Sequence, residues 1–198
     1  MAVSLDEIKR LKDLTGVGLT DAKRALEDAA GDFDKALAEM RKKGLTKAEK
    51  RGEREASQGM VDSYVHGGRI GVLVEVNCET DFVARTDDFK SLVHDLAMHI
   101  AASSPRFVSI DDIPAVEREA KAAEFTEKVK NEGKPEKMVA QIVEGMLKKH
   151  FAEQCLLEQP FIKNPDETVG TLVKSMISKL GENIVVRRMA RFELGVSE

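Results

Sequence analysis

Aromatic residues are scarce in this chain. Its 198 residues include no tryptophan, one tyrosine and eight phenylalanines, and the formal net charge is −4. Surfaces that bind single-stranded nucleic acid stack the bases on aromatic side chains, and proteins that bind phosphate backbones usually carry a basic excess or a basic stripe. We therefore expect no direct binding of nucleic acid, and we expect the partner to be a protein.

Cysteine and long apolar runs are also scarce. Cys78 and Cys155 are the two cysteines, too few for a disulfide framework, so both are expected to be reduced thiols. No apolar stretch approaches the roughly 18 residues that a membrane-spanning helix needs. The N-terminus begins with a charged amphipathic pattern rather than an apolar signal region. These features predict a cytoplasmic protein that does not enter a membrane.

The chain also lacks the motifs of the common enzymes. It has no Gly-x-Ser-x-Gly elbow and no phosphate-binding P-loop, and its histidines do not follow a metal-ligand spacing. Glu79 and Asp81 could form an acid pair, but carboxylates two residues apart near a strand end usually point in opposite directions. We expect no enzyme activity, no catalytic residue, no cofactor and no metal.

The N-terminal pattern predicts three short helices. Ser4 and Glu7 have the spacing of a capping box at the start of the first helix. Thr20 or Asp21 could cap the second helix. Gly44, which follows three basic residues, is predicted to end the third helix.

The composition changes after these helices, which predicts two domains. Residues 1–45 would form the three-helix domain. Residues 46–57 are so rich in Lys, Arg and Glu that they are expected to be a solvated helix or a charged linker. Residues 58–198 would form the core domain.

Alternating apolar residues predict a small sheet in that core. Residues 60–65 and 70–76 flank a Gly67-Gly68 turn and form a hairpin. A third strand is expected at residues 184–194, close to the C-terminus. Strict alternation would place five apolar residues of this strand on one face, with Arg188 interrupting them: Ile184, Val186, Ala190, Phe192 and Leu194.

Helices are predicted to cover this sheet. The apolar residues within 89–101 and within 169–180 follow a helical period. Residues from about 114 to 152 form two further helical segments joined at Gly133-Lys134-Pro135, the pattern of a helical hairpin. The first arm of the hairpin is highly charged, so it is expected to project. The fold class is therefore α+β, with about three antiparallel strands.

The junction between the second predicted strand and the next helix combines an acid with a large aromatic residue. Asp81 and Phe82 lie on a connection of only a few residues, between Thr80 and Val83. Rigid elements on both sides would fix this pair in one place. We regard these four residues as the candidate site.

Several motifs, in order along nearly the whole chain, resemble those of the bacterial elongation factor Ts family. The clearest are Leu14-Thr15-Gly16-Val17-Gly18, Asp21-Ala22-Lys23-Arg24-Ala25-Leu26, Val76-Asn77-Cys78-Glu79-Thr80-Asp81-Phe82-Val83-Ala84, Met98-His99-Ile100-Ala101-Ala102 and Gln159-Pro160-Phe161. The family comprises guanine-nucleotide exchange factors for the GTPase elongation factor Tu.

The resemblance implies a fold for each part of the chain. The N-terminal helices would form a ubiquitin-associated-like module, and the helical hairpin would correspond to the antiparallel coiled-coil insertion of the family. Long members have two related core subdomains, whereas this chain has the residues for one. It thus resembles the short form, for which a homodimer stays open.

The resemblance also implies a mechanism. Thr80, Asp81, Phe82 and Val83 would contact elongation factor Tu beside its Mg²⁺ site, and the factor would promote exchange of GDP for GTP. Leu19, Thr20 and His99 would make secondary contacts. Each contact has an alternative from the residues alone: Phe82 could pack in its own core, Leu19 and Thr20 could be a turn residue and a helix cap, and His99 could be a partly buried helix residue.

Two other functions compete with nucleotide exchange. A non-catalytic adaptor with a ubiquitin-associated-like module would tether a partner without changing nucleotide release. An RNA-associated translation protein would need a basic surface, for which Arg187, Arg188 and Arg191 provide a modest cluster.

Overall fold

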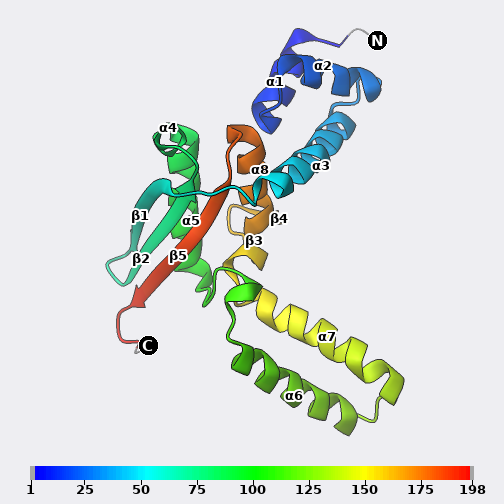
Figure 1. The fold of residues 1–198 in the computed structure, drawn as a ribbon, viewed down its shortest axis with the longest axis vertical. Coiled ribbons are helices and arrows are strands. Elements are labelled where there is room, and N and C mark those ends of the chain that lie inside the picture. The colour runs from blue at the N-terminus through cyan, green and yellow to red at the C-terminus, as the bar shows by residue number, and fades with distance from the viewer. Residues whose placement is uncertain (1–2, 197–198) are drawn as a thin grey trace.

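The N-terminal part of the chain forms three helices, as predicted. The structure is a computed structural model that describes residues 3–196, and of residues 46 and 47 it describes the backbone alone. The helices are α1 (Leu5–Thr15), α2 (Leu19–Asp28) and α3 (Phe33–Arg51) (Figure 1). The Ser4 hydroxyl accepts a hydrogen bond from the Glu7 amide at 3.1 Å, and the Glu7 carboxylate accepts from the Ser4 amide, so the predicted capping box is confirmed.

Helix α2 begins earlier than predicted. Its N-cap is Gly18, which makes no side-chain capping bond, and Leu19 is the first helical residue. Gly16 has a φ of 67° and ends α1 in the left-handed conformation, so the chain reverses within three residues and α2 starts at once. The expectation of a cap at Thr20 or Asp21 was wrong.

Helix α3 continues through Gly44, which was predicted to end it, and runs to Arg51. At Gly44 it passes close to α8 (Val169–Leu180), where a Cβ would lie 2.8 Å from the Ser178 Oγ. Beyond this point Ala48 is buried against the core, and the Arg51 guanidinium donates to the Ile177 carbonyl at 3.0 Å. Packing on α8 therefore keeps the chain helical at Gly44 and beyond it, so residues 46–51 are helical. The division into domains at 46–57 stays a prediction.

The core sheet has three antiparallel strands, as predicted. They are β1 (Gln58–His66), β2 (Ile70–Cys78) and β5 (Ile184–Glu193), in the order β1-β2-β5 (Figure 1). The hairpin turn uses Gly67 and Gly68, both with positive φ. The long connection from β2 to β5 contains most of the helices of the core.

The residues assigned to one face of β5 were partly wrong. Glu75 of β2 is opposite Arg188, but Val76 is opposite Val186, so Arg187 is an extra residue in a β-bulge. The bulge reverses the alternation: after it, Met189 packs against the core, whereas the outward face carries Ala190 and Phe192. One additional residue explains why strict alternation failed here.

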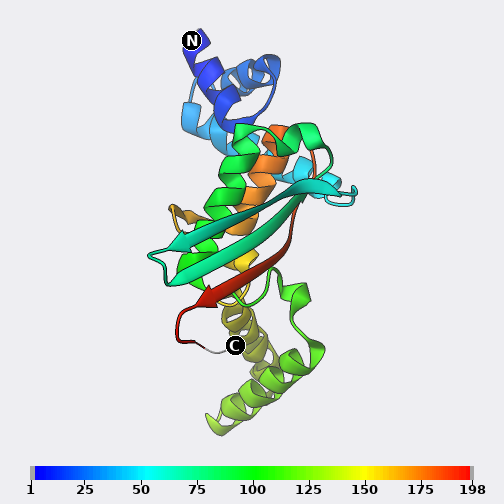
Figure 2. The same cartoon turned by 90° about the vertical axis from the view of Figure 1, so that its left-hand side faces the viewer.

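Helices cover one face of the sheet. Helix α5 (Asp87–Ser103) and helix α8 lie behind the strands in Figure 2, while the opposite face of the strands is turned to the viewer with no described helix across it. Phe89, Leu96 and Ile100 of α5 are fully buried. Both helices were predicted, and the core lies between them and the inner face of the sheet.

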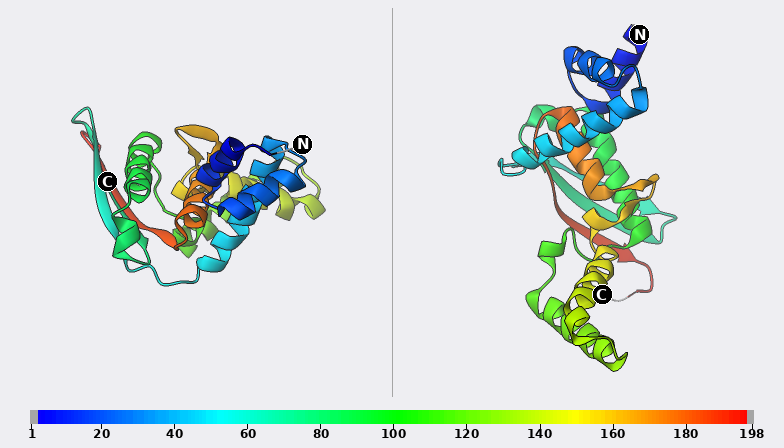
Figure 3. Two further views of the ribbon diagram at one scale, coloured as in Figure 1. Left: turned by 90° about the horizontal axis from the view of Figure 1, so that it is seen from above. Right: turned by 90° about the vertical axis from the view of Figure 1, so that its right-hand side faces the viewer.

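The helical hairpin projects from this core, as predicted. Its arms are α6 (Ala115–Asn131) and α7 (Glu136–Ala152), visible away from the sheet in Figures 1 and 3. Val129, Val139 and Val143 pack between the arms, and a separate small cluster with Phe151 closes the base. The α+β class is confirmed.

Four short elements between the hairpin and the sheet were not predicted. They are the 3₁₀ turns η1 (Ile110–Asp112) and η2 (Leu156–Glu158) and the strands β3 (Pro160–Phe161) and β4 (Asn164–Thr168), which pair with each other. None is long enough to show a hydrophobic period.

Candidate functional site

The predicted site is a single helical turn, α4 (Asp81–Ala84), between β2 and α5. Thr80 is its N-cap, and the Thr80 hydroxyl accepts from the Val83 amide at 3.4 Å. Thr86 caps the following helix: its hydroxyl accepts from the Phe89 amide at 3.3 Å and donates to the Val83 carbonyl at 2.8 Å. Two helix caps that follow each other closely therefore determine the shape of this connection.

Phe82 lies at the tip of this turn and is 79% exposed. Val83, the next residue, is partly buried and packs against the core. The turn thus anchors one apolar side chain and presents the other to solvent. The alternative in which Phe82 packs inside its own core does not fit this geometry.

Asp81 lies beside Phe82 and forms an ion pair with Arg85 at 2.9 Å. Both side chains are largely exposed, and an exposed ion pair one helical turn apart stabilises a protein by only about 0.3–0.5 kcal/mol. The pair is therefore weak enough for Asp81 to exchange Arg85 for a donor on a partner.

Thr80 is held from the far end of the chain. Both carboxylate oxygens of Glu182 accept from it, one from the Thr80 hydroxyl at 2.6 Å and the other from the Thr80 amide at 3.0 Å. In return, the Glu79 carboxylate accepts from the Asn183 amide at 2.7 Å. We call these four residues the carboxylate clasp. It joins the strand-to-helix connection to the segment between α8 and β5.

The clasp also reaches the end of α3. The Asn183 side chain is 2% exposed, and its amide nitrogen donates to the carbonyls of Arg54 at 2.7 Å and Gly52 at 3.3 Å. Arg54 lies 3.6 Å from the Glu79 carboxylate. One buried asparagine therefore connects the segment after α3 to the candidate site.

Cys78 completes the support of Thr80. Its thiol donates to the Thr80 carbonyl at 3.1 Å. Burial, and next the negative charge of Glu182, raise the pKa of the Cys78 thiol above its usual value. The side chain is therefore a neutral hydrogen-bond donor at neutral pH rather than a nucleophile.

Leu19 and Thr20 lie in the first turn of α2 and are exposed, Leu19 by 52%. Since Gly18 is the N-cap, Thr20 does not cap the helix, and the alternative that explained it in this way is removed. In Figure 1 the three-helix module and α4 lie toward the same end of the core. Leu19 and Thr20 on α2, and Phe82 on α4, are thus exposed on two separate elements of the molecule.

His99 does not lie on a surface. It is fully buried, its Nδ1 accepts from the Ile162 amide at 3.2 Å, and its Nε2 lies 3.0 Å from the Gln159 side-chain oxygen. Burial lowers the pKa of His99, so the ring is neutral, with Nε2 donating. The side chain supports the segment from Gln159 to Ile162, and we remove His99 from the candidate contacts.

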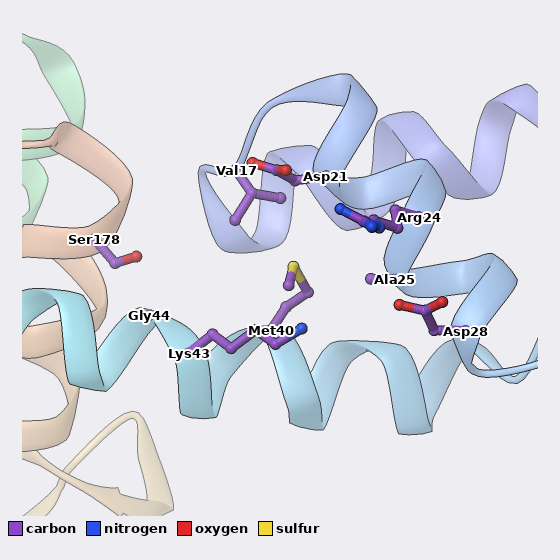
Figure 4. Close-up of a pocket in the computed structure, with 9 residues that line it drawn as sticks. All are labelled: Val17, Asp21, Arg24, Ala25, Asp28, Met40, Lys43, Gly44 and Ser178. Carbon is purple, nitrogen blue, oxygen red and sulfur yellow. The ribbon is translucent and has the colours of Figure 1, made fainter.

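A cavity of about 320 Å³ lies between α2 and α3 of the three-helix module, at the side that faces α8. Figure 4 shows that its lining comes mainly from α2 and α3, with Ser178 of α8 on the other side. Met40 projects into the space, and Asp21, Arg24, Asp28 and Lys43 form a rim of mixed charge. Because the rim has no excess of one sign, it favours no charged ligand, and we regard the cavity as a gap in the packing of α2 on α3.

Within residues 3–196, the structure shows no cluster of three or more His, Cys, Asp or Glu residues that could hold a metal ion. Across the same residues, no helix is long and apolar enough to cross a membrane.

The prediction from sequence missed Glu79, Glu182 and Asn183 as supports of the site. About a hundred residues separate the two halves of the clasp. The available signal was the pairing of β2 with β5: if the register of Cys78 with Ile184 continued, Glu79 would face Asn183 and Thr80 would face Glu182.

The match with known proteins covers most of the chain. The family model described as Elongation factor TS matches residues 45–196. The elongation factor Ts of Moorella thermoacetica is 52% identical over 198 residues, covering 98% of this chain and 96% of that protein. Those of Carboxydothermus hydrogenoformans and Heliobacterium modesticaldum are 54% and 52% identical, each covering 95% of this chain and 87% and 88% of the relative.

These matches identify the chain as a translation elongation factor, a protein of protein biosynthesis. More narrowly, it belongs to the elongation factor Ts family, as its motifs indicated, and the family implies elongation factor Tu as its partner.

Proposed function

We propose that this chain binds the GDP form of elongation factor Tu, disturbs the Mg²⁺ site of that GTPase and so promotes exchange of GDP for GTP. The observation that carries the proposal is the exposed ring of Phe82 on a turn that is fixed at both ends. In this proposal the chain supplies no catalytic residue and no cofactor.

The mechanism follows from the demands of the metal. Mg²⁺ requires nearly ideal octahedral geometry, so a small displacement of its ligands weakens its binding. Protein interiors are close-packed and respond to an inserted side chain by shifting neighbouring elements. Phe82 would act as the inserted group, and Asp81 would compete for donors nearby. Loss of the metal then weakens the contacts to the phosphates.

The energetics require a second contact. A thousandfold loss of nucleotide affinity corresponds to about 4 kcal/mol, and coupling between two ligands is reciprocal. Bound nucleotide must therefore weaken the binding of the factor to the GTPase by the same amount. The interface then needs further contacts away from the nucleotide and Mg²⁺ site. Leu19 and Thr20 of the three-helix module would provide them.

The direct test is the release of labelled GDP from elongation factor Tu, with and without this chain. We expect release to accelerate with factor concentration and to slow again when excess Mg²⁺ is added. Binding with an unchanged release rate would instead favour the tethering adaptor. Retention of RNA by the chain, lost as salt is raised, would favour the RNA-associated alternative.

We also propose that two copies of the chain associate through the outer face of the sheet. Five large apolar residues are at least 49% exposed on this face or in the adjoining C-terminal segment: Val61, Val65, Leu73, Phe192 and Leu194. The face has no described helix across it (Figure 2). Apolar patches of this kind on soluble proteins commonly mark an interaction surface, and a copy of the same face is the partner that we propose.

A further inference from the structure

The turn that carries Phe82 is too short to form by itself. Helix α4 has four residues, and the first hydrogen-bonded turn of a helix is unfavourable without support. Its shape therefore depends on the groups that hold its N-cap. Thr80 is that N-cap, and Glu182 is the side chain that binds both its amide and its hydroxyl.

The bond from the hydroxyl matters most. A threonine hydroxyl has one hydrogen and two lone pairs. Once the Thr80 hydrogen is donated to the Glu182 carboxylate, a lone pair is left to accept from the Val83 amide, which is the capping bond of α4. Glu182 thus orients the cap through a charge-assisted hydrogen bond, which is stronger than a neutral one.

The clasp continues the sheet beyond its last backbone pair. Cys78 is opposite Ile184 at the end of the β2–β5 ladder. At the next positions, the Glu79 carboxylate accepts from the Asn183 amide, and the Glu182 carboxylate accepts from the Thr80 amide. Side chains therefore keep the two segments in register where the main-chain ladder has stopped.

The segment between α8 and β5 also holds the end of α3, the helix that joins the core to the three-helix module with Leu19 and Thr20. Asn183 is buried and donates to the carbonyls of Gly52 and Arg54, directly after α3. Helix α3 belongs to the three-helix module at its start and packs on α8 at its end. The position of Phe82 and the end of α3 thus depend on two neighbouring residues.

We propose that Glu182 and Asn183 are positioning residues that hold the Thr80–Val83 turn in the shape required for exchange and fix Phe82 relative to the three-helix module. The inference rests on the proposed function. Neither side chain needs to contact the GTPase, because each acts through the groups it binds.

The test compares Glu182→Ala, Glu182→Gln and a control, Glu117→Gln. Glu117 also binds through both carboxylate oxygens, to Arg106 at the base of the hairpin, but it is remote from the clasp. For Glu182→Ala we expect the maximal GDP-release rate at saturating factor to fall at least about tenfold, since two charge-assisted hydrogen bonds are lost. The half-saturating concentration should change less than about threefold, since the docking surfaces remain.

Glu182→Gln should recover part of the lost rate, because its amide oxygen still accepts from the Thr80 amide. Glu117→Gln should match the unaltered chain. The proposal is overturned if Glu182→Ala keeps the full maximal rate, or if the rate falls and the half-saturating concentration rises together in proportion to lost thermal stability. If Glu182→Ala does not fold, the same criteria apply to Glu182→Gln.

A second readout needs no GTPase. Hydrogen exchange of the amides of residues 79–86 in the free factor should be faster in Glu182→Ala and unchanged in Glu117→Gln. If the unaltered chain fails to accelerate GDP release while this difference is seen, the proposed function fails and the clasp stands. If release is accelerated but exchange of these amides is unaffected by Glu182→Ala, the clasp fails alone.

Discussion

At the residue scale, Phe82 contributes little to the stability of the isolated chain. Burial of a phenylalanine side chain contributes about 1.5–3 kcal/mol, and at 79% exposure most of that contribution is missing. Val83, its neighbour, does pack against the core. The unused burial is therefore available to a partner that accepts the ring, which makes Phe82 a strong candidate for mutation.

We expect Phe82→Ala to slow factor-stimulated GDP release at least about tenfold, the effect of losing the burial of one aromatic ring in the complex. Thermal stability should change by less than about 0.5 kcal/mol, since the ring is exposed. Stopped-flow release of labelled GDP and thermal denaturation measure the two effects. Val116→Ala, which removes a side chain of 78% exposure from the hairpin, is the control. An unchanged release rate for Phe82→Ala would exclude the insertion mechanism.

His99 predicts a dependence of stability on pH. Burial lowers its pKa in the folded chain, so between that lowered pKa and the ordinary value of about 6.5 the unfolded chain binds more protons. Stability is therefore fully present above about pH 6.5 and is lost as pH falls toward the lowered pKa. Urea denaturation at pH 7.5 and 5.5 should show a smaller difference in His99→Gln than in the unaltered chain. An equal difference in both would assign the effect to other groups.

At the element scale, two positions require glycine for different reasons, one for its backbone conformation alone and the other for close packing as well. Gly16 and Gly31 both have positive φ, at 67° and 86°. A Cβ on Gly16 would overlap the Cα of Lys179 in α8, whereas a Cβ on Gly31 would meet no atom within 4 Å. The first glycine thus permits the three-helix module to approach the core, and the second serves only the turn.

Gly31→Ala should cost about 1–2 kcal/mol, the price of the left-handed conformation for a residue with a Cβ. Gly16→Ala should cost about 1–3 kcal/mol more, because the module must also move away from α8. Chemical denaturation of the two variants gives the comparison. Equal losses would mean that the module does not pack on α8 in solution.

Most of the elements were predictable because their apolar residues keep one period over several turns. Helices α5 and α8 and the hairpin arms are of this kind. The wrong predictions were confined to single positions. Gly44 resembles a helix end but is stabilised by packing on α8, and the bulge at Arg187 reverses the pattern of β5. Such features depend on a neighbour that is remote in sequence.

At the scale of the whole molecule, the candidate contacts were easier to predict than their support. Phe82 lies in a motif that can be recognised locally, Leu19 lies between two such motifs, and both are exposed. Glu182 and Asn183 follow a helix end and have no periodic signal of their own. Their importance appears only when β2 and β5 are paired, since the pairing brings them to Glu79 and Thr80.

The proposed homodimer has a direct test. Leu73 lies on the outer face of the sheet and is 49% exposed. Leu73→Lys would bury a charge between two copies, so we expect the dissociation constant of the dimer to rise at least about tenfold. Sedimentation velocity over a concentration series measures it, with Leu5→Lys on α1 as an exposed control. A chain that sediments as a monomer at every concentration would exclude the dimer.

Helix α3 contributes Met40 to the hydrophobic cluster of the three-helix module and Ala48 to the hydrophobic core beneath the sheet. The number of residues between them therefore sets how far the module is rotated about the helix axis and how far it lies from the core. Inserting one residue would turn the module by about 100° around the axis and advance it by about 1.5 Å. Leu19 would therefore change its position relative to Phe82. The length of this one helix therefore determines the angle between the two contacts with a partner.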